Sequence, residues 1–227
     1  MKLWAAELGT FWLSEAAHGL PPASAPAAPA TFGEVAPGDW GALQVAMNLP
    51  DPGPIRNRFQ AGRRCFCLKA AEQIVAYGWA TRGVERVGEL EREFQLAEDE
   101  VYIWDCATVP GWRGKRCYTV LLNQMLHRFQ REGLPRIWIG ASRHNQPSIQ
   151  GIIRAGFRHV MDMDYRRLWV LTWVQFTASP SASPAQIEAA YRILTAKNEK
   201  RWGRVAFGLY RDGVSAFKAH TPQEAIR

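Results

Sequence analysis

The feature that most constrains the fold is the order of segments within residues 100–157. The run EVYIWDCATV, residues 100–109, is rich in β-branched and aromatic residues and is typical of a buried strand. A basic turn, GWRGKR, follows it, and TVLLNQMLHRFQREG then places apolar residues at helical spacing. RIWIGA, residues 136–141, predicts a second strand. A strand, a helix and a strand in this order favour a parallel pair joined by a crossover.

Further predicted elements lie on both sides of this unit. Polar and apolar residues alternate across residues 64–81, which predicts an antiparallel hairpin. Residues 39–48 and 145–155 predict two helices, and residues 157–176 predict another pair of strands, 157–164 and 168–176. We therefore expect an α/β fold with a mixed central sheet and helices on both faces.

Two segments rich in Pro, Ala and Ser divide the chain. LPPASAPAAPA and TASPSASPA leave few backbone donors for regular structure and are typical of linkers. We expect three parts: an N-terminal part over residues 1–31, an α/β domain over residues 32–176, and an appendage over residues 177–227.

Both outer parts contain predicted elements of their own. Apolar residues at helical spacing predict an amphipathic helix over residues 3–17. In the appendage we expect a helix over residues 186–200, followed by a small hairpin that turns at Asp212 and Gly213.

The net charge of +7 and the isoelectric point near 9.5 favour anionic partners, such as nucleic acid or a phosphorylated cofactor. The basic residues are spread along the chain, and the tightest group, Arg113, Lys115 and Arg116, lies in the turn after the first buried strand. This distribution favours a cofactor-binding turn, and a basic nucleic-acid-binding protein is the weaker alternative.

Cysteine usage and the N-terminal segment indicate the compartment. The four cysteines have neither CxxC pairs nor the spacing with His that binds zinc, so we expect free thiols and no metal site. Glu7, Glu15 and His18 interrupt the apolar residues near the N-terminus, so we expect neither a secretory signal nor a membrane span. The expected location is cytoplasmic.

The turn over residues 109–118 offers a site for a phosphate group. At the start of a helix the backbone N–H groups lack intrahelical partners, and the helix dipole adds about half a positive charge. A pyrophosphate is well accommodated in such a place. The alternative is a helix start that is basic without binding anything.

Two segments together resemble a known family. VPGWRGKRCYTVLL and NQPSIQGIIRAGF resemble the acetyl-CoA-binding and C-terminal motifs of the GNAT superfamily of N-acetyltransferases. The resemblance extends over residues 56–176 and is sharpest over residues 101–157. Its parts are the strand that ends in Val-Pro, the Arg-Gly-Lys turn, the helix entry with Asn145 and Ser148, and the Gly156-Phe157 pair.

The turn departs from the family pattern at two positions. The family signature, Q/R-x-x-G-x-G/A, begins here at Arg113 and places Arg116 and Tyr118 where small residues are usual. Small residues let a pyrophosphate approach the amides closely. The two large side chains must therefore point away from the amides, although an arginine can also donate a charge-assisted hydrogen bond to a phosphate.

The resemblance implies acetyl-CoA, or another acyl-CoA, as the cofactor. In such a site the first strand splays from its parallel neighbour, and the freed backbone pairs with the pantetheine arm. The turn amides hold the pyrophosphate, and Asn145 lies near the thioester. The residues implied in cofactor binding are Cys106, Ala107, Val109, Arg113, Gly114, Lys115, Arg116, Cys117, Tyr118, Asn145 and Ser148.

Acyl transfer to an amine requires a base for the incoming ammonium group and an acid for the leaving thiolate. Asp105 is a carboxylate inside the predicted strand and is our candidate base; the alternative is a core Asp bound to the backbone or to an arginine. Family members often have a Tyr acid where this chain has Ile152. The acid is therefore unassigned, with Tyr118 and Tyr165 as candidates.

The predicted function is transfer of an acetyl or other short acyl group from CoA to an amine of a small molecule or a protein. The sequence does not identify the acceptor. Arg56 and Arg58 lie where the family often binds acceptors, although a solvated pair is the simpler explanation. A module of the same shape that binds CoA without catalysis is the first alternative, because of the residues at positions 116, 118 and 152.

Overall fold

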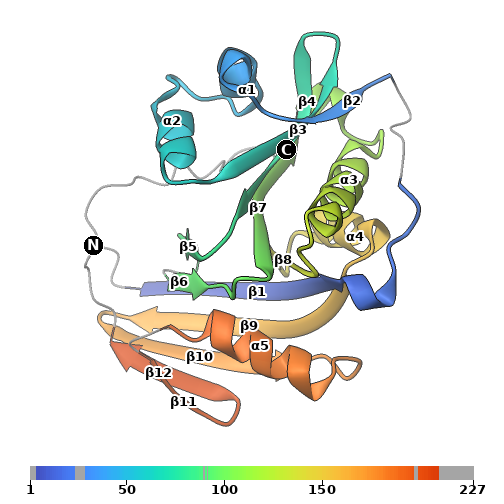
Figure 1. Cartoon of the computed structure of the whole chain (residues 1–227). Coiled ribbons are helices and arrows are strands. Elements are labelled where there is room, and N and C mark those ends of the chain that lie inside the picture. The colour runs from blue at the N-terminus through green and yellow to red at the C-terminus, as the bar shows by residue number, and fades with distance from the viewer. Residues whose placement is uncertain (1–3, 24–28, 89, 91, 197–198, 210–227) are drawn as a thin grey trace.

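The computed structural model describes residues 4–23, 29–88, 90, 92–196 and 199–209 (Figure 1). Its strands are β1 (Trp4–Glu15), β2 (Thr31–Glu34), β3 (Arg64–Ala70), β4 (Gln73–Thr81), β5 (Val84–Val87), β6 (Arg92–Gln95), β7 (Glu100–Thr108), β8 (Arg136–Ser142), β9 (Arg158–Leu168), β10 (Leu171–Ala178), β11 (Glu199–Trp202) and β12 (Val205–Leu209). Its α-helices are α1 (Trp40–Ala46), α2 (Gly53–Gln60), α3 (Cys117–Arg131), α4 (Gln146–Ala155) and α5 (Pro184–Leu194).

Within the described residues, ten strands form one mixed sheet in the order β11-β12-β10-β9-β1-β8-β7-β4-β3-β2, and β5 pairs with β6 alone. β7 and β8 are parallel neighbours, with α3 as the connection between them, which confirms the predicted strand, helix and strand. The hairpin of β3 and β4 is also confirmed.

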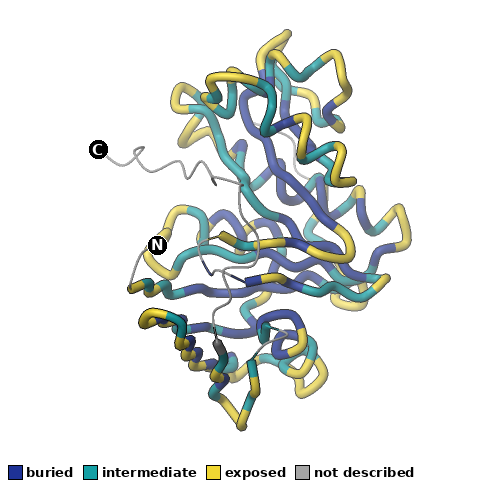
Figure 2. Tube along the Cα trace, turned by 90° about the vertical axis from the view of Figure 1, so that its left-hand side faces the viewer, coloured by how far each residue is buried: buried dark blue, intermediate teal, exposed yellow. Residues whose placement is uncertain are grey.

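Helices cover both faces of this sheet, as predicted (Figure 1). On one face, α3 and α4 bury residues such as Leu121 and Ile152 against Ile137 of β8. On the other face, α1 and α2 cover β3 and β4, and α5 packs against β9 and β10. The buried residues therefore lie mainly along the strands, and the exposed residues lie mainly in the outer turns and loops (Figure 2).

The predicted N-terminal helix over residues 3–17 is wrong, because residues 4–15 form strand β1. This strand lies between β8 and β9 and is antiparallel to both. Phe11, Trp12 and Leu13 are all buried, since a strand in the middle of a sheet is covered on both faces. A continuous apolar run of this kind is easily read as helical spacing, and the pairing with β8 and β9 decides the outcome.

The C-terminal predictions are only partly right. Helix α5 ends at Leu194, short of the predicted end at residue 200, and Glu199–Trp202 forms strand β11 instead. β11 pairs with β12 through a turn at Gly203 and Arg204. The predicted turn at Asp212 and Gly213 lies outside the described residues. β9 and β10 form a hairpin whose turn lies at residues 169–170, later than predicted.

A buried ion pair ties β11 to the rest of the molecule. The Arg92 guanidinium lies 2.8 Å from the Glu199 carboxylate, and each side chain is only 2% exposed. Arg92 also donates a hydrogen bond to the Leu194 carbonyl at the end of α5 and lies over the Tyr165 ring of β9. One side chain thus connects β6, β11, α5 and β9.

We predict that Arg92→Ala lowers the free energy of unfolding by about 3–5 kcal/mol, because the Glu199 carboxylate then stays buried without its cationic partner. Urea titration followed by circular dichroism measures this. Glu188→Ala is the matched control: it removes an ion pair to Arg201 in which Glu188 is 71% exposed, and it should cost less than about 1 kcal/mol. Equal losses for the two variants would show that the buried pair does not hold β11.

Candidate active site

The two parallel strands β7 and β8 part halfway along their length. They pair from Glu100 opposite Arg136 to Ile103 opposite Ile139. Beyond Ile103, β7 pairs only with β4, whereas β8 continues to Ser142 alongside β1. The splay that the family resemblance implied is therefore present, and the carboxyl half of β7 has an open edge.

A β-bulge in β7 causes this separation. Trp104 lies opposite Trp79 and Ala107 lies opposite Tyr77, so β7 has one residue more than β4 in this interval. Asp105 takes up the extra length with a φ of 43°. A bulge of this kind bends the strand and increases its twist, which carries the end of β7 away from β8.

The bulge also decides which backbone groups face the open edge. The Val109 amide donates a hydrogen bond to the Val75 carbonyl (3.0 Å), so it is not free, contrary to the sequence-based expectation. Residues of an antiparallel strand alternate between the two edges. Ala107, like Val109, therefore faces β4, while Cys106 and Thr108 face the open edge.

Thr108 was missed by sequence reasoning, because nothing in the residue pattern reveals the bulge. Its carbonyl accepts a hydrogen bond from Arg113 Nε at 3.3 Å. Its Oγ1 atom is buried and has no hydrogen-bond partner within the part of the chain that the structure describes. Six other buried side-chain polar atoms of the described residues are likewise unpaired, so this hydroxyl does not by itself indicate a ligand.

The turn after β7 is open to solvent. Arg113, Gly114, Lys115 and Arg116 are all exposed. Gly114 and Arg116 have φ values of 76° and 62°, and a Cβ atom placed on Gly114 would meet no atom within 4 Å. The N-cap residue Arg116 makes no side-chain capping hydrogen bond, so within the described residues the amides of the first turn of α3 are suited to an anion.

The Tyr118 side chain points away from this turn and packs against α4. A Cβ atom on Gly151 would lie 2.9 Å from the Tyr118 ring atom Cε1, so the ring requires a glycine there. The Tyr118 hydroxyl hydrogen-bonds with the Ser148 side chain. Burial raises the pKa of this hydroxyl well above its usual range, and the nearby Cys106 thiol adds to the shift, so Tyr118 stays protonated.

Asn145 and Ser148 lie at the start of α4, beside the start of α3. The Asn145 side chain caps the helix by accepting a hydrogen bond from the Ser148 amide (3.2 Å). Since Ser148 also contacts Tyr118, the amino ends of the two helices are linked. The predicted cofactor residues from positions 113–118 and 145–148 thus lie in one neighbourhood.

Asp105 is bound to an arginine, which was the alternative to a free base. Arg58 Nη1 of α2 lies 2.5 Å from Asp105 Oδ2. The Arg58 guanidinium lies 4.9 Å and 4.6 Å from the ring centres of Trp79 and Trp104. Both partners of the ion pair keep partial contact with solvent, so the carboxylate is accessible.

Asp105 and Cys106 face opposite sides of the sheet. Asp105 faces α2, whereas a Cβ atom on Gly78 would lie 2.8 Å from Cys106 Sγ and 3.2 Å from Met125 Sδ of α3. Burial raises the pKa values of the Cys106 and Cys117 thiols, so both are poor nucleophiles. The geometry therefore favours packing roles for the two cysteine side chains.

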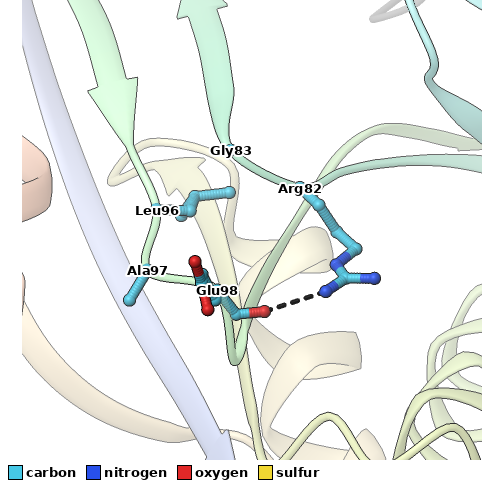
Figure 3. Close-up of a pocket in the computed structure, with 5 residues that line it drawn as sticks. All are labelled: Arg82, Gly83, Leu96, Ala97 and Glu98. Atoms are coloured by element: carbon cyan, nitrogen blue, oxygen red, sulfur yellow. Dashed lines mark hydrogen bonds between the residues drawn. The ribbon is translucent and has the colours of Figure 1, made fainter.

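A separate hollow lies near the amino end of β7, away from the turn (Figure 3). The Arg82 guanidinium donates a hydrogen bond to the Glu98 carbonyl across it (2.9 Å). The hollow is lined by Arg82, Gly83, Leu96, Ala97 and Glu98. Because β7 runs from this hollow toward the turn, the hollow is not part of the candidate active site.

Neither a metal-binding cluster nor a membrane-spanning helix is present among the described residues. Among the described residues, His, Cys, Asp and Glu side chains form no group of three that could hold a metal ion. Within the same residues, each helix is too short or too polar to cross a membrane.

Comparison with known proteins identifies the class. The model of the acetyltransferase (GNAT) family matches residues 38–157, which is more than half of the chain and includes the parted strands, the turn and α4. The protein is therefore an acetyltransferase by family. It belongs to the GNAT family, as the sequence motifs indicated.

Of two similar solved structures, the first, with a TM-score above 0.5, supports the fold. An acetyltransferase of the GNAT family from Colwellia psychrerythraea is similar with a TM-score of 0.52 and 11% identity, over 78% of this chain and 58% of that one. The ribosomal-protein-S18-alanine N-acetyltransferase of Escherichia coli gives 0.46 and 14%, over 57% and 78%. No curated protein matches the sequence.

We predict that Gly151→Ala destabilises the protein by about 1–3 kcal/mol, because the new methyl group overlaps the Tyr118 ring. Thermal unfolding measures the loss. The double variant with Tyr118→Ala should show strong coupling, since the overlap is then relieved. Gly111→Ala is the control, because a Cβ atom there meets nothing within 4 Å. Additive losses in the double variant would contradict the packing of Tyr118 on α4.

Proposed function

We propose that the protein transfers an acetyl group, or another short acyl group, from CoA to an amine of a small molecule or a protein. The observation that carries the proposal is the open edge of β7 leading into an exposed, basic and uncapped start of α3. Membership of the GNAT family supports acetyl-CoA as the cofactor. When bound, acetyl-CoA supplies the acyl group as a thioester.

The residues of this chain fit such a cofactor. The backbone of Cys106 and Thr108 offers hydrogen bonds to the amides of the pantetheine arm. The long, exposed hydrogen bond from Arg113 to the Thr108 carbonyl can be exchanged for one of these. The amides of residues 114–118 hold the pyrophosphate, and Lys115 and Arg116 add positive charge.

The amine has to lose a proton before it attacks, and Asp105 is the candidate base. It lies at the bulge where β7 leaves β8 and faces α2, the side opposite Cys106. Arg58 holds the carboxylate in place, and the Trp79 and Trp104 rings hold Arg58. In this arrangement Asp105 accepts the proton of the ammonium group while its position is kept by Arg58.

The leaving thiolate needs a proton, and Tyr118 is the candidate acid. Its hydroxyl carries a proton and its hydrogen bond with Ser148 fixes its direction, although the burial that raises its pKa also makes it a weaker proton donor. Tyr165 is a poor candidate, because it is buried on β9 beneath Arg92 in the core under α5. Ile152, where the family often has its Tyr, is fully buried among apolar residues.

The cofactor site is tested by reversing charge in the turn. Lys115→Glu combined with Arg116→Glu should weaken acetyl-CoA binding at least about tenfold, because a charged hydrogen bond contributes about 1.5–3 kcal/mol. Isothermal titration calorimetry measures the dissociation constant. Arg154→Glu with Arg158→Glu is the matched control, since it changes the net charge equally at exposed positions away from the turn. An unchanged dissociation constant in the first variant would place the cofactor elsewhere.

The proton-transfer residues are tested by turnover. Asp105→Asn and Tyr118→Phe should each lower kcat about 10²-fold or more while leaving acetyl-CoA binding within a few fold. Release of the CoA thiol with a panel of amines measures the rate. Tight binding of acetyl-CoA by the wild-type protein without turnover on any amine would favour a non-catalytic CoA-binding module.

A further inference from the structure

One face of the sheet is rich in exposed apolar side chains. Of the ten large hydrophobic residues that are exposed within the described ranges, seven belong to β1, β9, β10, β11, β12 or the turn between β9 and β10. The three others are scattered over α1, β5 and α4. Such an uneven distribution is unusual, because exposed apolar residues on a soluble protein are normally isolated.

The strand register places these side chains on a single face. Trp4 of β1 pairs with Leu168 of β9, which pairs with Leu171 of β10. Two residues along β10, Trp173 pairs with Phe207 of β12. Alternate residues of a strand share a face, so these rows lie side by side. The outer face is formed by Trp4, Leu168, Leu171, Trp173, Phe207 and Trp202.

The opposite face of the same strands is covered. Val174 and Phe176 of β10 are buried with Ala190 and Leu194 of α5. In the part of the chain that the structure describes, no helix covers the alternating residues on the outer face, and Trp202, Trp4 and Trp173 are 70%, 55% and 46% exposed. The sheet is thus packed on one side only in this region.

The outer face is already ordered for packing. The Trp173 and Phe207 rings are stacked with their centres 6.0 Å apart, and the Trp202 ring lies 6.3 Å from Phe207. The Arg166 guanidinium lies over the Trp173 ring at 5.9 Å. Because these side chains hold one another in place, a partner would lose little of their conformational entropy on binding.

The area of this face matches what a stable dimer buries. An aromatic side chain offers up to about 250 Å², so the three tryptophans alone expose roughly 400 Å², and the six residues together roughly 700 Å². This exceeds the largest apolar patch of a typical monomer, which is about 300–600 Å². It approaches the roughly 800 Å² that each partner contributes to a stable interface.

The charges on the outer face suit a second copy of the same chain. Arg166 forms a 2.8 Å ion pair with Asp164 on this face, and Lys200, which lies opposite Phe207, is a further exposed cation there. The face therefore carries little of the net charge of +7, and two identical faces repel each other only weakly. A nucleic acid would instead require an excess of basic residues among the aromatic ones.

We propose that the outer face is the interface of a homodimer, in which two sheets pack face to face about a twofold axis. Stacked sheets lie about 10 Å apart, which brings Trp173 and Trp202 of each copy against the partner. The proposal is independent of the proposed function, since no residue of the turn or of the Asp105 pair belongs to this face.

Sedimentation equilibrium of the full chain at about 1–100 μM tests the dimer. The wild-type protein should have twice the mass of the monomer at the upper end of this range. Trp173→Glu combined with Trp202→Glu should raise the dimer dissociation constant at least 100-fold, because central aromatic residues dominate interface energetics. Val45→Glu is the matched control, since it places a charge at an exposed apolar residue on α1 and should leave the mass unchanged.

Three results would overturn the proposal. A wild-type protein that is monomeric throughout this range has no such interface, whether because another part of the chain covers the face or because its partner is a different protein. A dimer that persists unchanged in the double Glu variant uses another surface. If the wild-type protein sediments with lipid vesicles and does not self-associate, the face binds a membrane instead. The wild-type measurement needs no substitution, and Trp202→Glu alone, at the most exposed of these residues, locates the interface if the double variant fails to fold.

Discussion

The extra residue in β7 is the constraint on which the candidate site depends. Strand β7 pairs with two neighbours, antiparallel β4 and parallel β8. The bulge at Asp105 prevents β7 from pairing with both strands beyond Ile103. Pairing with β4 is kept and pairing with β8 is given up. The freed edge, the orphaned Thr108 hydroxyl and the direction of the turn into α3 all follow from that choice.

The same bulge separates the two sides of the proposed chemistry. It directs Asp105 toward α2 and packs Cys106 against α3, which leaves the open edge of β7 for the proposed cofactor and the α2 side for the proposed acceptor. Each side is braced by packing at a distance from the reacting atoms. Trp79 and Trp104 restrict Arg58, and Gly151 makes room for Tyr118. Catalytic groups whose supports are rigid need little reorganisation during the reaction.

The sheet extends well beyond the strands that carry the site. β1 inserts between β8 and β9, and β11 and β12 add a further hairpin at the outer side. The buried pair of Arg92 and Glu199 fastens that hairpin to β6 and α5. Among the described helices only α5 packs on this extension, so its other face is apolar and exposed within those residues. The structural basis of the proposed dimer is thus a sheet longer than its helices can cover.

Local sequence patterns were enough to predict much of the fold and part of the candidate site. The strand, basic turn, helix and strand over residues 100–141, the hairpin of residues 64–81 and the capped helix at Asn145 are readable because each depends on periodicity or on neighbours a few residues away. The motifs also sufficed to indicate the GNAT family, which the match over residues 38–157 established. The boundaries of the three predicted parts remain a prediction, although strands from all three share the sheet.

Contacts between distant residues decided the remainder. Residues 4–15 form a strand because they pair with the edges of β8 and β9, and the local sequence does not predict these partners. Three contacts of the site likewise join segments far apart in the chain. They are the ion pair of Asp105 with Arg58, the hydrogen bond from the Val109 amide to Val75, and the packing of Tyr118 on Gly151. The sequence by itself determined which residues are able to form a cofactor-binding turn, because helix-start chemistry is local. Only the tertiary structure decided which backbone and side-chain groups face it, because that depends on how a bulged strand shares its two edges.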